Sequence, residues 1–157
     1  MHSMIGFRYT FFIMLKDFID DVSALGGVTV YSLVVLATIL LGEYDISYKL
    51  ITSLLLIFVS AYSIKLVYAN PRPDSKKRKL PSLLERLNES SFPSVHVARI
   101  SVLSVCMYSV FPALLYLSVL LIFLVGYSRV SMKRHYVSDV VAGVAIGFLI
   151  GYFIFVK

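Results

Sequence analysis

Two apolar segments on either side of a short polar one decide the fold: residues 113–156 read ALLYLSVLLIFLVGYSRVSMKRHYVSDVVAGVAIGFLIGYFIFV. Residues 113–127 and 136–156 are predominantly apolar, whereas residues 128–135 hold two arginines, a lysine and a histidine. A transmembrane helix needs about 20 mostly apolar residues, and charges beside such a helix are costly to keep near lipid. The pattern therefore predicts two membrane helices joined by a turn whose charged residues have a function.

The composition of the whole chain favours the same class. Of the 157 residues, 59% are hydrophobic and only 15% are charged, against about 25% charged in a soluble domain. We expect an all-α fold, a polytopic membrane helix bundle with five to six transmembrane helices. The net charge of +6 lies beside hydrophobic segments, so anionic lipid headgroups or phosphate are expected as partners, and nucleic acid is not. Cys106 is the only cysteine, which excludes an intramolecular disulfide and a thiolate metal cluster.

Apolar runs mark the expected transmembrane segments, and the first 22 residues differ from them. The expected spans are residues 24–42, 50–69, 95–111, 113–127 and 136–156. In residues 1–22, apolar residues recur at helical spacing opposite Lys16 and the acidic residues, which predicts an amphipathic helix in the membrane interface. A weakly hydrophobic first span is the alternative. We thus divide the chain into an interfacial helix, 1–22, and a membrane core, 23–157.

The order of the expected spans brings the polar segments to one side of the membrane. Counted from residue 24, the chain crosses and returns before residues 70–93, and crosses and returns again before residues 128–135. Residues 70–93 form the one long connection and contain four prolines and a basic run at 76–79. That run is typical of a solvated loop that touches headgroups, or of a funnel for an anionic substrate.

The polar segments hold side chains suited to phosphate. Lys65 and Arg72 are seven residues apart, about two helical turns, which predicts that they project from one side of a helix stopped by the prolines at 71 and 73. Ser94 is placed to cap the helix that starts at FPSVH, and the free backbone N–H groups of such a helix start bind anions. Each feature in isolation is also typical of an ordinary span end.

The third segment contains a histidine and a carboxylate on one helical face. His135 and Asp139 are four residues apart, so the carboxylate can fix the imidazole tautomer and leave the other ring nitrogen free to attack. Arg129 lies six residues before His135 and is placed to hold phosphate oxygens. His96, beside the helix start, is placed to protonate a leaving oxygen.

Taken together, the residues spell Lys-x6-Arg-Pro, Pro-Ser-Val-His and Ser-Arg-x5-His-x3-Asp over residues 65–139. This order and spacing resembles the three-part signature of the type 2 phosphatidic acid phosphatase superfamily. The resemblance implies a phosphatase of the cell membrane that uses no cofactor and no metal. It also implies a lipid phosphate substrate: a polyprenyl diphosphate, phosphatidate or phosphatidylglycerol phosphate.

The resemblance also implies a role for each matching residue. His135 would be the nucleophile that forms a phosphohistidine, Asp139 would orient it, and His96 would be the general acid. The phosphate would be bound by Lys65, Arg72, Ser94, Val95 and Arg129, with Arg129 also stabilising the transferred charge. Val95 stands where the family has glycine, and valine lacks strain-free access to positive φ. The contribution of residue 95 to phosphate binding is therefore in question, although its backbone N–H remains.

Two rival functions and the orientation stay open at this stage. A transporter of anionic lipid would need polar residues at mid-span, and a non-catalytic scaffold would be expected to lack a histidine or Asp139. The excess of basic residues near the expected site favours the cytoplasmic side by the positive-inside rule, whereas many relatives have their site on the other side. The membrane face of the site and the oligomeric state are not determined by the sequence.

Overall fold

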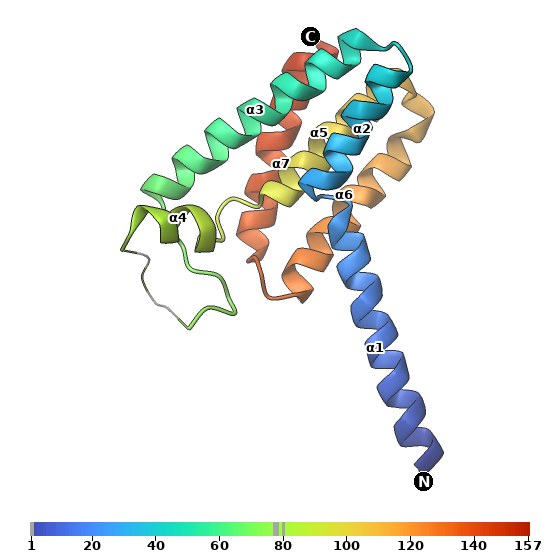
Figure 1. Ribbon diagram of the computed structural model, residues 1–157, viewed down its shortest axis with the longest axis vertical. Helices are drawn as coiled ribbons and strands as arrows, with labels where there is room; N and C mark the ends of the chain where they lie inside the picture. The colour runs from blue at the N-terminus through green and yellow to red at the C-terminus, as the bar shows by residue number, and fades with distance from the viewer. Residues whose placement is uncertain (1, 77–78, 80) are drawn as a thin grey trace.

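The computed structural model describes residues 2–76, 79 and 81–157 and confirms the predicted all-α fold (Figure 1). The helices are α1 (His2–Ala24), α2 (Val28–Leu40), α3 (Tyr44–Val67), α4 (Leu83–Glu89), α5 (Val95–Val110), the 3-10 turn η1 (Pro112–Leu114), α6 (Leu115–Ser131), α7 (Val137–Gly151) and the π-helical turn η2 (Tyr152–Val156). Within the described ranges the only β pairing is an isolated bridge between Pro71 and Ser90.

Length and hydropathy identify the helices that can cross a membrane. Three described segments qualify alone: α3, α6 with its preceding 3-10 turn, and α7 with its π-helical extension. A fourth crossing results if the end of α1 and α2 are counted together, because the two form an apolar pair bent by 49°. The chain is thus a membrane protein built from a helical bundle.

The expected span at 24–42 is wrong at its start, since α1 continues to Ala24 and α2 begins only at Val28. The 13 residues of α2 rise about 20 Å, which is less than the roughly 30 Å of a hydrocarbon core. The bend lies at Leu25–Gly27, where a Cβ on Gly26 would come within 2.7 Å of the His96 carbonyl oxygen. Glycine is therefore needed for the close approach of this bend to α5.

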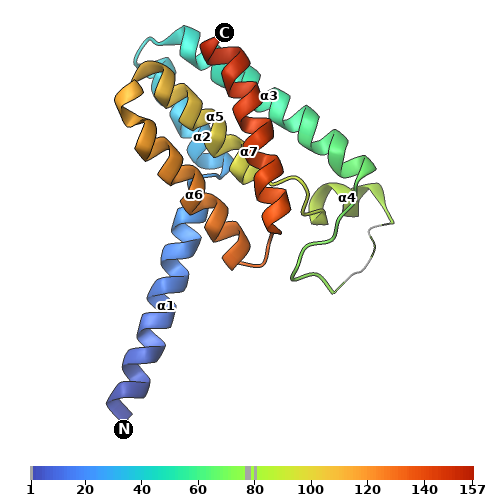
Figure 2. The same ribbon diagram turned by 180° about the vertical axis from the view of Figure 1, so that it is seen from behind.

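The N-terminal part of α1 projects away from the bundle in both views (Figures 1 and 2). Its C-terminal end packs against α6. Phe18 and Met14, on the projecting part, are more than half exposed. The assignment of residues 1–22 to the membrane interface remains a prediction.

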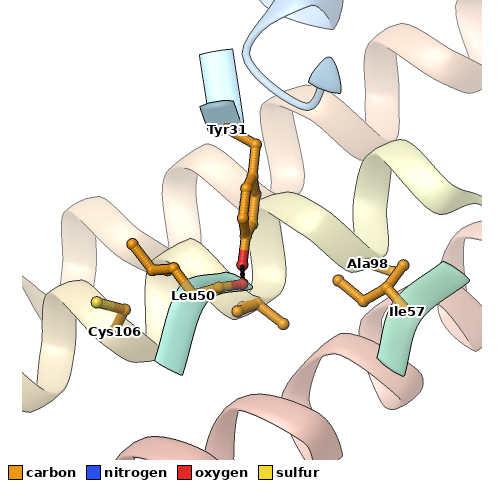
Figure 3. Packing of buried hydrophobic residues seen from close by; sticks show 6 residues of the cluster. Tyr31, Leu50, Ile57, Ala98 and Cys106 are labelled. Atoms are coloured by element: carbon orange, nitrogen blue, oxygen red, sulfur yellow. Dashed lines mark hydrogen bonds between the residues drawn. The ribbon is translucent and has the colours of Figure 1, made fainter. Parts of the chain in front are cut away.

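Helix α5 is the central element of the bundle, with the other long helices around it (Figures 1 and 2). It has only 16 residues, but nine of them are buried, so it meets protein on most of its circumference. Figure 3 shows one apolar cluster at its surface, in which the Tyr31 hydroxyl donates a hydrogen bond of 2.9 Å to the Leu50 carbonyl. Because α5 is enclosed by protein, its polar residues are kept away from lipid.

Small residues on α7 let it approach α5 closely. Gly143, Gly147 and Gly151 recur every fourth residue and are all buried. A Cβ on Gly143 would lie 2.6 Å from the Ser94 carbonyl oxygen, and one on Gly151 would lie 2.9 Å from the Val105 Cβ. This is the small-residue packing typical of membrane helices, where close backbone contact replaces the hydrophobic driving force.

The polar connections gather at one end of the bundle, opposite the α2–α3 turn and the C-terminus (Figure 1). The backbone N–H of Asp74 donates to the Lys133 carbonyl (3.2 Å), and Arg134 pairs with the Asp74 carboxylate (3.5 Å). The Ser94 N–H donates to the Asp139 carbonyl (3.0 Å). These contacts join the three polar segments of the sequence directly.

The glycine face of α7 gives a stability prediction. A methyl group on Gly147 would press on the Ala98 carbonyl and lie 2.7 Å from the Ser101 Cβ. We expect Gly147→Ala to lower the melting temperature in detergent by about 3–10 °C, the usual cost of overpacking, although alanine favours helix. Ala145→Val, on the exposed face of the same helix, is the control and should change it by less than about 2 °C. An unchanged or raised melting temperature for Gly147→Ala would contradict the packing argument.

Candidate functional site

Lys65 and Arg72 reach the same pocket by a route that the sequence did not predict. The expectation that they share one helical face is wrong, because α3 ends at Val67 and Arg72 lies in the segment after it. Pro71 has no backbone N–H to donate, and the segment is held instead through the backbone carbonyl of Asn70. This carbonyl accepts a hydrogen bond of 2.7 Å from the Ser91 N–H. Lys65, in the last turn of α3, is buried. The loop, and not helical periodicity, places Arg72 beside it.

Backbone carbonyls orient both cations. The Lys65 ammonium donates to the Ser90 carbonyl at 3.0 Å, and an Nη2 hydrogen of Arg72 goes to the Asn88 carbonyl at 2.8 Å. Neither bond neutralises the positive charge, since a carbonyl carries only a partial charge. Both groups therefore retain their attraction for an anion.

The second segment starts α5 at the predicted position. Ser94 is the N-cap, but its side chain makes no capping hydrogen bond, and its buried Oγ has no partner among the described residues. Val95 is the first helical residue, and the only described non-glycine residue with positive φ is Lys133, at 55°. The valine therefore fits the helix start without the backbone conformation that favours glycine. His96 follows in the first turn.

The third segment brings Arg129, His135 and Asp139 together around the α6–α7 turn. The His135 backbone N–H donates to the Arg129 carbonyl at 3.3 Å, and an Nη1 hydrogen of Arg129 goes to the Ser23 hydroxyl at 2.8 Å. Asp139 is fully buried, and its Oδ2 accepts the Tyr136 backbone N–H at 2.8 Å. The His135 Nδ1 lies 3.6 Å from the same Oδ2. A small rotation of the imidazole would close this distance to a hydrogen bond.

One cavity of about 340 Å³ unites the three segments. Its walls include Lys65, Arg72, Val95, His96, Arg99, Arg129 and His135, together with Val28, Phe58, Tyr62, Leu87 and Asn88. Ser94 and Asp139 are buried and are not among the residues that line the cavity. No carboxylate is among the lining side chains in the described part of the chain, so the cavity is a strongly positive site suited to an anion such as phosphate.

Burial lowers the pKa of His135 and of Arg72, which both lie in the connections between helices. The pKa of His135 lies below its usual value because burial disfavours the imidazolium, while the hydrogen-bonding interaction with Asp139 partly opposes this shift. The pKa of Arg72 is lowered by burial and by the positive charge of Arg134. His135 is therefore neutral, and able to act as a nucleophile, at neutral pH.

Two residues at the site were not identified from the sequence. Arg99 lies outside the three motifs, yet it lines the cavity and is buried. An arginine one turn after His96 in an apolar helix is a signal for it, since charges within spans are rare without a function. Ser23, the partner of Arg129, carries no such signal because the two residues are 106 positions apart.

Larger cavities elsewhere lack this chemistry. A groove of about 590 Å³ between α2, α5 and α6 is lined almost entirely by apolar side chains, among them Val34, Leu103 and Met107. Glu43 is its one ionised lining group within the described residues. A negative charge in an apolar wall does not suit phosphate, so the smaller basic cavity is the candidate site.

Comparison with known proteins agrees with this geometry. A family model described as the PAP2 superfamily matches residues 46–157, which include every cationic and histidine residue predicted for the site. No match was found among curated proteins or among solved structures. The family suggests phosphatase activity on phosphate esters, and apolar helices agree with a membrane location. The chain belongs to the PAP2 superfamily.

Proposed function

We propose that this protein is a multi-pass phosphatase of the cell membrane that removes the terminal phosphate from a lipid phosphate or diphosphate monoester. One observation carries the proposal: two histidines and four cationic side chains line a single cavity of about 340 Å³. Phosphoryl transfer depends mainly on positioning and charge neutralisation, which such a wall supplies. A phosphohistidine is the intermediate that the arrangement favours.

His135 is the proposed nucleophile. Its Nδ1 faces the Asp139 carboxylate, so Nε2 is the nitrogen directed to the cavity and available to attack phosphorus. Attack forms a P–N bond and breaks the P–O bond to the leaving group. Water then attacks the phosphohistidine, which releases inorganic phosphate and restores the imidazole. Asp139 supports this role by favouring the tautomer that carries its proton on Nδ1.

His96 is the proposed general acid, and the cations are the proposed phosphate ligands. His96 lies in the first turn of α5, across the cavity from the α6–α7 turn that carries His135. It would donate a proton to the leaving oxygen, and accept one from the attacking water in the second step. Lys65, Arg72 and Arg129 would bind the phosphate oxygens, with help from the backbone N–H of Val95 at the helix start. The backbone N–H of Ser94 would not contribute, because it donates to the Asp139 carbonyl.

The proposed reaction uses no metal ion. Side-chain cations take the place that a divalent ion holds in many phosphoryl-transfer sites. The described residues contain no group of three His, Cys, Asp or Glu side chains arranged to hold a metal. The cationic lining of the cavity supports a mechanism in which the arginines stabilise the transferred charge.

Apolar residues at the cavity support a lipid substrate. Val28 and Phe58 line it beside the cations, and Val28 is 45% exposed at the start of α2. A phosphate tethered to a hydrocarbon chain can thus enter the basic cavity while the chain stays beside apolar helix surface. Polyprenyl diphosphates, phosphatidate and phosphatidylglycerol phosphate all have this form.

Substitution of the two histidines should separate their roles. His135→Ala removes the nucleophile, so we expect no acid-labile phosphate on the protein and no turnover with any substrate. His96→Ala should reduce turnover of an alkyl phosphate by about 10²–10⁴. It should reduce turnover of a nitrophenyl phosphate far less, because nitrophenolate leaves without a proton. Phosphate release and trapped phosphoenzyme measure both effects. Normal turnover by His135→Ala, or equal losses for His96→Ala on both substrates, would contradict the assignment.

The pH dependence should report His135. The neutral imidazole is the active form and its pKa lies below 6.5, so activity should be at its plateau at pH 7 and fall only below about pH 6.5. Asp139 raises this pKa, so Asp139→Asn should move the acid limb to lower pH while the plateau falls by about 10²–10³.

The control for this pH profile is Asp45→Asn, which removes an exposed carboxylate paired with Lys49 in α3, near the opposite end of the bundle. It should leave both the plateau and the limb unchanged. An acid limb that moves to higher pH in Asp139→Asn would show that the limb does not report His135.

Activity should persist in an excess of chelator, because the charges at the site are side chains. Phosphate release in millimolar EDTA, before and after addition of magnesium, measures this. Vanadate should inhibit, since it mimics the phosphoryl group in transfer and can bond to the His135 imidazole. Complete loss in EDTA that magnesium restores would refute the metal-free mechanism.

A further inference from the structure

Arg99 is a fourth cation of the cavity, and it is buried in the bundle. It is on the central helix α5, one turn after His96, and only 5% of its surface is exposed. It lines the same cavity as the two histidines. A guanidinium remains charged in a protein, so this site holds a positive charge almost out of contact with water.

The partners of Arg99 differ from those of the other cations. Lys65, Arg72 and Arg129 each donate to a protein oxygen at 2.8–3.0 Å. In the described part of the chain, the hydrogen bond found for Arg99 is a long one, 3.5 Å from Nη2 to the His96 Nδ1. Its buried Nε has no partner there, as is also true of the Nε atoms of Arg72 and Arg129, so the difference is that Arg99 has no hydrogen bond to a protein oxygen there. A buried charge without a counterion is costly, which indicates that an anion completes this site.

The position of Arg99 relative to the reacting groups indicates which anion it would bind. His96, the proposed general acid, marks the leaving-group side of the cavity, and Arg99 follows it by three residues on the same helical face. The leaving group of a simple lipid monophosphate is an alcohol, which has no charge to offer this arginine. The leaving group of a lipid diphosphate is a lipid monophosphate, which is anionic before and after the bond breaks.

We propose that Arg99 binds the phosphoryl group that stays on the lipid, and that the protein therefore prefers lipid diphosphates to lipid monophosphates. This inference rests on the proposed function. The terminal phosphoryl group is transferred to His135 and the bridging P–O bond breaks. The electron pair of that bond stays on the lipid phosphate, next to Arg99, and the proton comes from His96. The three cations at the other segments remain the ligands of the transferred group.

A narrower role for Arg99 would have a different consequence. Through its contact with the His96 Nδ1, Arg99 would only set the orientation of the imidazole and so position the general acid. Loss of that contact would impair monophosphates and diphosphates alike. The ratio of the two activities therefore distinguishes substrate binding from positioning.

The test compares a prenyl diphosphate with the monophosphate of the same chain in detergent, for the wild type, Arg99→Met and Arg99→Lys. We expect Arg99→Met to lower kcat/KM for the diphosphate by roughly 10- to 100-fold, and for the monophosphate by less than about 3-fold. Arg99→Lys should retain part of the preference, because it keeps the charge but not the planar donor pair. Lys49→Met is the control for loss of a positive charge, since Lys49 pairs with the exposed Asp45 in α3, near the opposite end of the bundle. Its activity ratio should equal that of the wild type.

A binding measurement keeps the test independent of turnover. Methylenediphosphonate should raise the melting temperature of the wild type more than methylphosphonate does, and Arg99→Met should abolish this difference. Without ligand, Arg99→Met should be at least as stable as the wild type, because it removes an unpaired buried charge.

The outcomes separate the two proposals. Equal losses on both substrates, or an unchanged ratio in Arg99→Met, would overturn the assignment of Arg99. Hydrolysis of neither substrate by the wild type would overturn the proposed function. In that case a diphosphonate preference that depends on Arg99 would still establish the second anion subsite.

Discussion

The close contact of α7 with the start of α5 is the constraint on which the rest of the site depends. The Asp139 carbonyl accepts the Ser94 N–H at 3.0 Å, and Gly143, one turn later, leaves room for the Ser94 carbonyl. This contact joins the segment that carries His96 to the segment that carries His135. A side chain at residue 143 would push these two segments apart, so that His96 and His135 would no longer line the same cavity.

Positive charge is concentrated at this contact, and the neutral oxygens that orient the cations do not neutralise it. Backbone carbonyls of the 88–90 segment and the Ser23 hydroxyl orient three of the cations. Asp139, the one buried carboxylate among the described residues, lies next to His135. The cations repel one another, so the empty arrangement is less stable than one that holds an anion. In the proposed function, binding of phosphate would relieve this repulsion, and the repulsion is the stability cost of a preformed site.

Much of this could be predicted from the sequence, because it depends on local patterns. Apolar length located α3, α6 and α7, and the number of crossings placed three polar segments on one side. The features that were predicted wrongly, or not at all, depend on contacts between residues far apart in the sequence. The bend at Leu25–Gly27 follows from the approach of Gly26 to α5, Arg72 is placed by pairing of its loop with the 88–91 segment, and Ser23 meets Arg129 only in the folded bundle. Arg99 was visible as a charge in an apolar helix, but its lack of a counterion is a property of the three-dimensional structure.

The bend between α1 and α2 has a consequence for how the protein can be divided. The family match begins at residue 46, after both helices, yet Ser23 orients Arg129, Gly26 rests on the carbonyl of His96, and Tyr31 is hydrogen-bonded to Leu50. The segment shared with the family is therefore not an autonomous module. Without the first two helices, α5 would lose its contact with α2, and Arg129 would lose its hydrogen bond to the Ser23 hydroxyl. Residues 23–31 are a structural component of the candidate site, which therefore extends beyond the boundaries of the shared domain.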